Sequence, residues 1–160
     1  MSCIHFYQSP VGILEITEKN AYITGVRLLA SQDAVPENKA DSDLPILFTE
    51  ACKQLDEYFA NKRTTFDLPI QYPNGTPFQY SVWNALRDIP YGETRSYKDI
   101  AVAIGNPKAV RAIGQANTRN PILLHVPCHR VINKKGSIGG FGCGVEIKKQ
   151  LLQLEGIKIS

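Results

Sequence analysis

The sequence of 160 residues predicts an α/β domain over residues 1–75, followed by a mainly α-helical domain over residues 76–160 that contains a helix-turn-helix. β-branched residues dominate two short runs between positions 11 and 28, as in paired strands. Beyond these runs, apolar residues recur at helical spacing in several segments. The run Tyr72-Pro73-Asn74-Gly75 is typical of a turn and places the domain boundary near residue 75.

The first domain is predicted to hold a small antiparallel sheet and one helix. Residues 11–17 and 22–28 are expected to form a hairpin with its turn at residues 18–20. Residues 30–45 are polar and should form a surface loop. Apolar residues at helical spacing then predict a helix over residues 47–59.

A third strand is predicted at residues 66–70, where apolar residues alternate. Pro69 has no amide hydrogen, so this strand belongs at a sheet edge. Cys3 and His5 could begin a metal site, but no second pair stands at the spacing that zinc ligands prefer. Structural roles are therefore favoured for both residues, and no metal is predicted.

The second domain is predicted to open with a helix that Thr76 caps, with Pro77 at its first position and Pro90 at its end. A last helix is predicted over residues 144–155. Glu155 then lies at the negative end of the helix dipole, where a carboxylate is mildly unfavourable. A residue placed against local preference can mark a functional position.

Two short helices, over about residues 97–104 and 107–118, are predicted to form the helix-turn-helix with Gly105 and Asn106 between them. Ser96 is the expected cap of the first. The core-facing residues of the second are expected to be Val110, Ile113 and Gly114. Its polar face, with small residues among long ones, comprises Lys108, Arg111, Ala112, Gln115, Ala116 and Arg119. Such a face can press closely against a nucleic-acid groove.

Charge is distributed unevenly along the chain. Residues 1–76 carry 6 Lys/Arg and 10 Asp/Glu, a net charge of −4. Residues 95–135 carry 8 Lys/Arg and one acid, Asp99, a net charge of +7. A basic block of this kind indicates a polyanionic partner, with a solvated basic face as the alternative.

With 43% hydrophobic residues, the chain can bury a core. No apolar run approaches the roughly 18 residues of a membrane span, and the N-terminus lacks an apolar signal core. The cysteines, Cys3, Cys52, Cys128 and Cys143, show no paired spacing, which favours free thiols in a reducing compartment. We therefore expect a soluble, cytoplasmic protein. No cofactor is expected.

The segment that most suggests chemistry is residues 127–131, Pro-Cys-His-Arg-Val, which lies between an apolar run and the glycine-rich residues 136–142. A thiol of pKa about 8.5 is only about 3% ionised at pH 7. A nucleophilic Cys128 therefore needs a base or a positive field, and His129 and Arg130 are candidates for those roles. Two other interpretations are a small buried hydrophobe and a zinc-binding pair, although adjacent ligands are unusual for structural zinc.

Four motifs follow one another in the second half of the chain. They are Arg-Ala-Ile-Gly-Gln-Ala at 111–116, Asn-Pro at 120–121, an apolar run ending in Pro-Cys-His-Arg-Val at 122–131, and Leu-Leu with Glu-Gly within 151–156. Together they resemble the O6-alkylguanine-DNA alkyltransferases, also called methylated-DNA–protein-cysteine methyltransferases. The resemblance covers residues 76–157 densely and the first half in outline.

The resemblance implies DNA repair by direct reversal of damage. Cys128 would attack the alkyl carbon on O6 of guanine, or alternatively on O4 of thymine, in an SN2 displacement and keep the group, so each molecule reacts once. His129 would take the thiol proton through a water, and Glu155 would orient His129. Asn120 resembles the hinge residue of the family. Tyr97 resembles the tyrosine that helps to turn the nucleotide and hydrogen-bonds the departing guanine.

The resemblance also implies that the second helix of the helix-turn-helix enters the minor groove of double-stranded DNA and that the damaged nucleotide is flipped out. Arg111 would fill the gap. The other implied DNA contacts are Thr94, Ser96, Ala112, Gln115, Arg119 and Arg130. The implied substrate pocket comprises Val131, Gly139, Phe141, Gly142 and Cys143. The implied folds are ribonuclease-H-like for the first domain and winged-helix-like for the second, in a monomer without an obligate protein partner.

One departure from the family pattern is Cys143, which stands where the family often has the first of two glycines in the wall of the alkyl pocket. Two alternatives come from other classes of protein. The first is a binding module that flags lesions without reacting, against which Cys128 argues. The second is a hydrolase that uses Cys128 and His129, whose acyl-enzyme would turn over.

Overall fold

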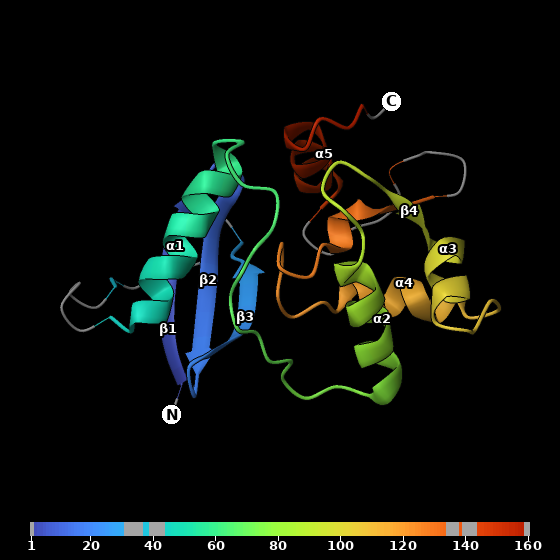
Figure 1. Cartoon of the computed structure of the whole chain (residues 1–160), viewed down its shortest axis with the longest axis horizontal. Helices are drawn as coiled ribbons and strands as arrows, with labels where there is room; N and C mark the ends of the chain where they lie inside the picture. The colour runs from blue at the N-terminus through green and yellow to red at the C-terminus, as the bar shows by residue number, and fades with distance from the viewer. Residues whose placement is uncertain (1, 31–36, 39–43, 134–137, 139–143, 159–160) are drawn as a thin grey trace. The chain divides into compact units, whose positions relative to one another are not determined.

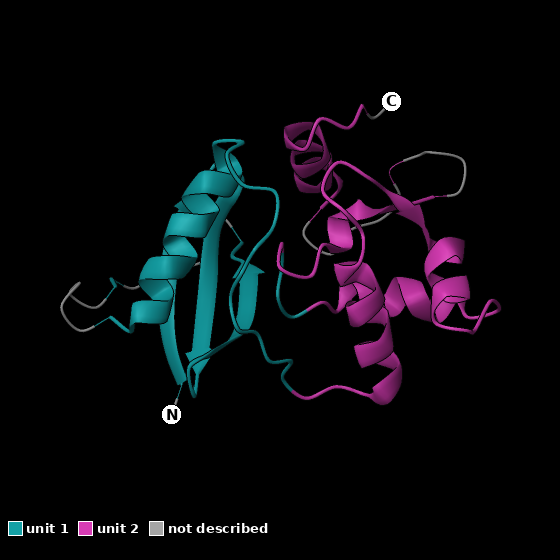
Figure 2. Cartoon of the chain, viewed as in Figure 1, with its two compact units in different colours: residues 1–73, 121–123 teal, residues 74–120, 124–160 magenta. Residues whose placement is uncertain are grey.

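The computed structural model describes residues 2–30, 37–38, 44–133, 138 and 144–158. The chain divides into two compact units (Figures 1 and 2). Unit 1 comprises Met1–Pro73 with Pro121–Leu123, and unit 2 comprises Asn74–Asn120 with Leu124–Ser160. As the sequence predicts, an antiparallel sheet with a helix precedes a mainly helical unit.

The sheet of unit 1 has three antiparallel strands in the order β1-β2-β3. They are β1 (Ser2–Ser9), β2 (Gly12–Lys19) and β3 (Tyr22–Leu28). The predicted hairpin is formed by β2 and β3, but its turn lies at Asn20 and Ala21 rather than at residues 18–20. Both turn residues have positive φ, 54° and 67°. This conformation matches the twist of a two-residue hairpin turn. β1 was not predicted, because its buried and exposed positions alternate only weakly, as in an edge strand.

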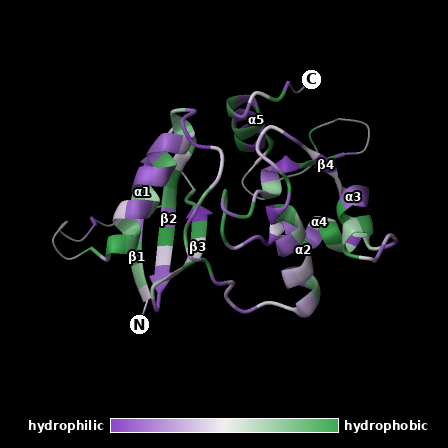
Figure 3. Cartoon of the chain, viewed as in Figure 1, coloured by the Kyte–Doolittle hydropathy of each residue, from purple (hydrophilic) through white to green (hydrophobic). Residues whose placement is uncertain are grey.

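One face of this sheet packs against α1 (Ile46–Phe59), which contacts β1 and β2. The helix matches the prediction from its apolar spacing. Phe48 and Tyr58 are fully buried with Leu14 and Ile16 of β2. The visible side of α1 carries several hydrophilic residues (Figure 3). Burial of the apolar stripe, rather than local propensity, therefore fixes this helix.

The prediction of a strand at residues 66–70 is wrong. Only an isolated parallel bridge forms there, between Ile23 and Ile70. The Ile23 amide donates to the Pro69 carbonyl at 2.9 Å, and the Gln71 amide donates to the Ile23 carbonyl at 3.0 Å. The ladder cannot extend toward residue 66, because Pro69 has no amide hydrogen to donate.

A second segment bonds to the same strand further along. The Val26 amide donates to the Pro121 carbonyl at 3.0 Å, and the Leu123 amide donates to the Val26 carbonyl at 2.9 Å. The chain thus returns to unit 1 just before the motif at 127–131. These backbone bonds anchor the start of the segment that carries Cys128.

Unit 2 contains four α-helices and one short parallel strand pair in the part of the chain that the structure describes. The helices are α2 (Pro77–Arg87), α3 (Tyr97–Ala103), α4 (Val110–Thr118) and α5 (Val145–Leu154), and the strands are β4 (Arg95–Ser96) and β5 (Val131–Ile132). The predicted caps are present: Thr76 and Gln79 form a capping box on α2, and Ser96 and Asp99 form one on α3. Within the described ranges, no helix is both long and apolar enough to cross a membrane.

The helix pair α3–α4 differs from the predicted helix-turn-helix in its connection. Gly105, with φ of 78°, ends α3 as expected, but α4 begins at Val110 rather than at residue 107. The Ala109 amide donates to the Asn106 carbonyl at 3.0 Å, so residues 106–109 form a turn. Val110 therefore begins the helix and is 39% exposed, contrary to its predicted core position, whereas Ile113 is fully buried.

Candidate active site

Cys128 begins a single 3-10 turn, Cys128–Arg130, and is only 2% exposed. The turn leads into β5, which pairs in parallel with β4. Because β4 runs directly into α3, this pairing brings Tyr97 at the start of α3 toward the cysteine turn. The strand pair was not predicted, since two-residue strands leave no periodic pattern in a sequence.

Two asparagines fix the segment around the cysteine. Asn120 donates its Nδ2 hydrogen to the Val126 carbonyl at 2.6 Å, and the Cys128 amide donates to the same carbonyl at 2.8 Å. Asn117, buried on α4, donates its Nδ2 hydrogen to the Cys128 carbonyl at 3.3 Å. Asn117 thus links α4 directly to the backbone of Cys128. It was missed in the sequence, although an asparagine inside a helix is against propensity and could have indicated it.

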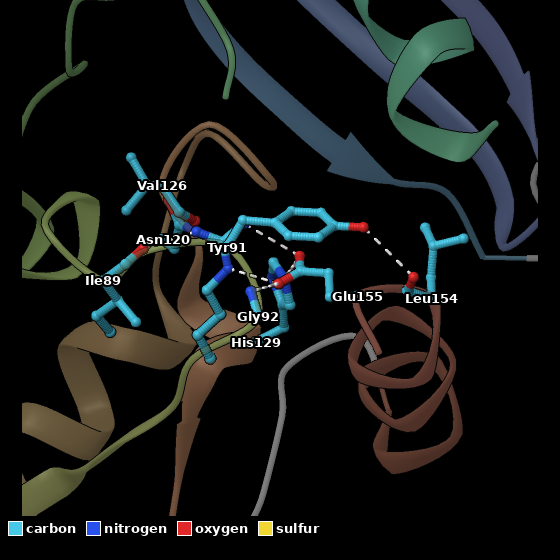
Figure 4. A network of polar contacts seen from close by, with 9 residues as sticks. Ile89, Tyr91, Gly92, Asn120, Val126, His129, Leu154 and Glu155 are labelled. Atoms are coloured by element: carbon cyan, nitrogen blue, oxygen red, sulfur yellow. Dashed lines mark hydrogen bonds and ion pairs between the residues drawn. The ribbon is translucent and has the colours of Figure 1, made fainter. Parts of the chain in front are cut away.

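Glu155 is the centre of a polar network that joins the cysteine turn to the end of α5 (Figure 4). His129 Nε2 lies 2.6 Å from Glu155 Oε2. Arg130 donates to both carboxylate oxygens, from Nε at 2.8 Å and from Nη2 at 3.1 Å. The Gly92 amide donates to Glu155 Oε1 at 3.4 Å. The structure therefore brings the predicted pair His129 and Glu155 together.

The electrostatics of this network favour a neutral imidazole beside a carboxylate. Burial alone would raise the pKa of Glu155, but hydrogen bonds and charges from His129 and Arg130 outweigh burial and lower the pKa to about 2. Burial lowers the pKa of His129, against the opposite effect of Glu155. With Glu155 ionised, the hydrogen of the neutral imidazole belongs on Nε2, which leaves Nδ1 as a proton acceptor.

Lys148 on α5 is a charged residue of the site that the sequence analysis missed. Its side chain is fully buried, and Nζ lies 6.0 Å from the centroid of the Tyr97 ring. Burial lowers the pKa of Lys148 to about 8, although the nearby Cys128 acts in the opposite direction. Burial also raises the pKa of Tyr97, and Cys128 contributes to this shift. Cys128, Tyr97 and Lys148 therefore form one electrostatic cluster.

A helical-wheel signal for Lys148 was present in the sequence. It stands three and four residues before Leu151 and Leu152 and seven before Glu155, so all four share one face. All four are buried. A lysine in the middle of a buried face is rarely accidental, because burying its charge is costly.

The residues that were expected to touch DNA divide into two groups. Arg111, Gln115 and Arg119 are exposed on or next to α4, and Thr94, Ser96 and Ala112 are half-buried. The Ser96 hydroxyl also accepts the Asp99 amide as the cap of α3. Arg130 is the exception among these predictions. The predicted DNA contact of Arg130 is corrected, because it is only 6% exposed and its guanidinium is held by Glu155 and by the Ile89 carbonyl.

Of the predicted pocket residues, Val131 is fully buried in β5. Gly139, Phe141, Gly142 and Cys143 lie outside the described residues.

Among the residues described, no group of three His, Cys, Asp or Glu side chains could hold a metal ion. His5, considered as a ligand, stacks on Phe48 with 5.5 Å between the ring centroids.

Fold and site together define a two-unit protein that holds a buried thiol beside an imidazole–carboxylate pair, with a neighbouring helix whose exposed side carries Arg111 and Gln115. Residues 3–72 match the family described as the ribonuclease-like domain of 6-O-methylguanine DNA methyltransferase. Residues 77–157 match the DNA binding domain of the same protein. The chain therefore belongs to the 6-O-methylguanine DNA methyltransferase family, which confirms the resemblance seen in its motifs.

Similar proteins cover nearly the whole chain. The constitutive methylated-DNA–protein-cysteine methyltransferase of Bacillus subtilis is 50% identical over 157 residues, covering 94% of this chain and 93% of the relative. The methylated-DNA–protein-cysteine methyltransferase of Methanosarcina acetivorans is 45% identical over 152 residues, covering 94% and 96%. The crystal structure of Mycobacterium tuberculosis OGT in complex with DNA aligns with a TM-score of 0.84 at 43% identity, covering 95% and 91%. The predicted fold class is thereby confirmed.

Proposed function

We propose that this protein repairs DNA by transferring a methyl or larger alkyl group from O6 of guanine in duplex DNA to Cys128, once per molecule. O4 of thymine is the alternative position of the alkyl group. The observation that carries the proposal is the 2.6 Å contact between His129 and Glu155 directly beside a buried Cys128. Membership of the family, together with relatives that are named for this reaction, supports it.

The proposed reaction begins with the thiol proton. The S–H bond of Cys128 breaks, and the proton passes through a water to His129 Nδ1. A sulfur electron pair then forms the bond to the alkyl carbon, while the carbon–O6 bond breaks and its electrons remain on guanine. The product is a thioether. Its carbon–sulfur bond is not broken again under these conditions, so the alkyl group stays on Cys128. No cofactor is needed for this balance of atoms and electrons.

Tyr97 and Lys148 act on the charges that develop in this step. The raised pKa of Tyr97 keeps its phenol protonated at neutral pH, so it can donate a hydrogen bond to the departing guanine. The ammonium of Lys148 attracts the thiolate form of Cys128. The Asn120 bond to the Val126 carbonyl holds the segment between α4 and the thiol in place, as expected of a hinge.

Binding of DNA is assigned to the exposed side of α4. We propose that α4 enters the minor groove, with Ala112 and Gln115 against the backbone, and that Arg111 fills the gap left by the flipped nucleotide. Thr94, Ser96 and Arg119 flank this surface. Val131, Gly139, Phe141, Gly142 and Cys143 are the proposed pocket residues. We further propose that the protein is cytoplasmic and monomeric. Sedimentation of the purified protein with and without duplex DNA would test the monomer.

Intact-mass spectrometry tests the proposed function. After incubation with a duplex that contains O6-methylguanine, every active molecule should gain the mass of one methylene, and peptide mapping should place it on Cys128. A protein that binds the duplex but keeps its mass would be a binding module. Repeated turnover of an ester by an unmodified protein would indicate a hydrolase.

Arg111→Ala is expected to slow transfer from duplex DNA by about tenfold to hundredfold, because extruding a nucleotide costs a few kcal/mol that Arg111 helps to offset. Reaction with the free base O6-benzylguanine should keep its rate, since no flipping is involved. Single-turnover rates on the two substrates measure the difference. Arg87→Ala, at an exposed position at the end of α2, is the control. Equal losses on both substrates would contradict the assignment.

A further inference from the structure

Arg130 is built into the interior of unit 2. Its side chain is 8% exposed, and each of its three nitrogens has an acceptor. Nε and Nη2 donate to the two oxygens of Glu155, and Nη1 donates to the Ile89 carbonyl at 2.7 Å. The guanidinium also lies over the Tyr91 ring, 5.7 Å from its centroid. A buried arginine with an acceptor for each of its three nitrogens serves the site and not the surface.

The contacts of Glu155 show what Arg130 does there. Both carboxylate oxygens accept hydrogen bonds, from His129, from Arg130 twice and from the Gly92 amide. A proton placed on either oxygen would point at one of these donors and break its bond. The carboxylate of Glu155 is fully buried, so no water can take the place of a lost donor at low cost.

We propose that Arg130 is a positioning residue that holds Glu155 as a carboxylate and thereby makes His129 the end point of the thiol proton. The inference rests on the proposed roles of Cys128 and His129 and adds a role to the arginine. When the S–H bond of Cys128 breaks, the new N–H bond forms on His129 Nδ1. The Nε2 hydrogen stays with His129, and Glu155 gains no proton but balances the charge of the imidazolium.

Arg130 acts on His129 in a second way. The charged groups that act on His129 are Glu155 at the end of α5, Lys148 on α5 and Arg130 itself, while Tyr91 faces Glu155. Glu155 favours the imidazolium, whereas Arg130 and Lys148 disfavour it. Arg130 therefore helps to keep His129 neutral before the reaction. Its loss should let His129 take up a proton at higher pH.

The first test is the pH dependence of thiol reactivity in Arg130→Met and Arg130→Lys. The rate of Cys128 alkylation by iodoacetamide should fall on the acid side at a pH about one unit higher in Arg130→Met than in the parent protein. Arg130→Lys keeps the charge but not the paired contact, so its shift should be smaller. Transfer from O6-methylguanine duplex should show the same displacement. If folded variants lose reactivity at the same acidic pH as the parent protein, the proposal is overturned.

A matched control is Arg63→Met in unit 1. Arg63 also donates from Nε to a carboxylate, Glu57 at 3.0 Å, and from Nη1 to a backbone carbonyl, that of Thr65 at 3.0 Å. Its loss should cost two hydrogen bonds of the same kinds without moving the pH at which the rate of Cys128 alkylation falls. A shift of the same size in this control would show that reduced stability, and not Arg130, sets the profile.

A measurement on the parent protein removes dependence on how the variants fold. The 13C resonance of the Glu155 carboxyl should keep its carboxylate shift from pH 8 down to pH 4, before and after methylation of Cys128. Titration near the ordinary glutamate pKa of about 4.3 would overturn the proposal. Because neither iodoacetamide nor this resonance requires DNA, both tests hold even if no alkyl transfer from guanine is detected.

Discussion

Cys128→Ala is expected to abolish alkyl uptake while leaving the protein folded and able to bind duplex DNA. The substitution removes only a sulfur atom from a buried position, so its cost in stability should be about 1 kcal/mol. Water does not substitute for the missing thiol, because uptake of the alkyl group requires an acceptor atom that belongs to the protein. Intact mass after incubation with O6-methylguanine duplex should show no added methylene, and binding to the duplex should persist.

Cys52→Ala is the matched control for this loss. Burial and the neighbouring Asp56 raise the pKa of the Cys52 thiol to about 11, so it stays protonated and unreactive at neutral pH. Removal of Cys52 should therefore leave transfer stoichiometric. Uptake of an alkyl group by Cys128→Ala would instead show that the acceptor is another residue.

The elements that could be predicted well are those fixed by neighbours in the chain. Thr76 and Ser96 mark the starts of α2 and α3 because each capping box closes within four residues. The start of α4 was misplaced because Pro107 suits a helix start locally, whereas the chain uses the turn at residues 106–109 to redirect itself. β1 and the bridge at Ile70 depend on partners elsewhere in the sheet and could not be inferred from their own residues.

The same distinction explains the predictions of the site. The motif that contains Cys128 and His129 is contiguous, and the unfavourable helix position of Glu155 drew attention to it. The DNA contact of Arg130 was implied by the resemblance, and its real acceptors could not be inferred because they lie far along the chain, Glu155 at 25 positions and Ile89 at 41. Lys148 was missed because only apolar residues were counted in the stripe of the last helix, although it shares a buried face with Leu151 and Leu152.

Lys148→Met is expected to make the protein more stable and less reactive. Methionine fills a similar volume without burying a charge, so the free energy of unfolding should rise by about 1–2 kcal/mol at pH 7. The melting temperature should then rise by roughly 2–8 °C for a chain of this length. Transfer to Cys128 should fall about tenfold to hundredfold, because the thiolate loses a nearby cation whose attraction is on the order of 1–3 kcal/mol.

The pH dependence of stability distinguishes this cause from better packing. The folded-state pKa of Lys148, about 8, lies below the ordinary value of 10.5. The protein with lysine is therefore least stable below pH 8 and regains stability as the pH rises through 10.5, above which the side chain is neutral in both states. The advantage of Lys148→Met should be full at pH 7 and shrink between pH 8 and pH 10.5. Thermal unfolding across this range measures it, with Lys149→Met as the control on the same helix. A pH-independent gain in stability, or unchanged transfer, would contradict the charge-based role because packing alone would then account for the substitution.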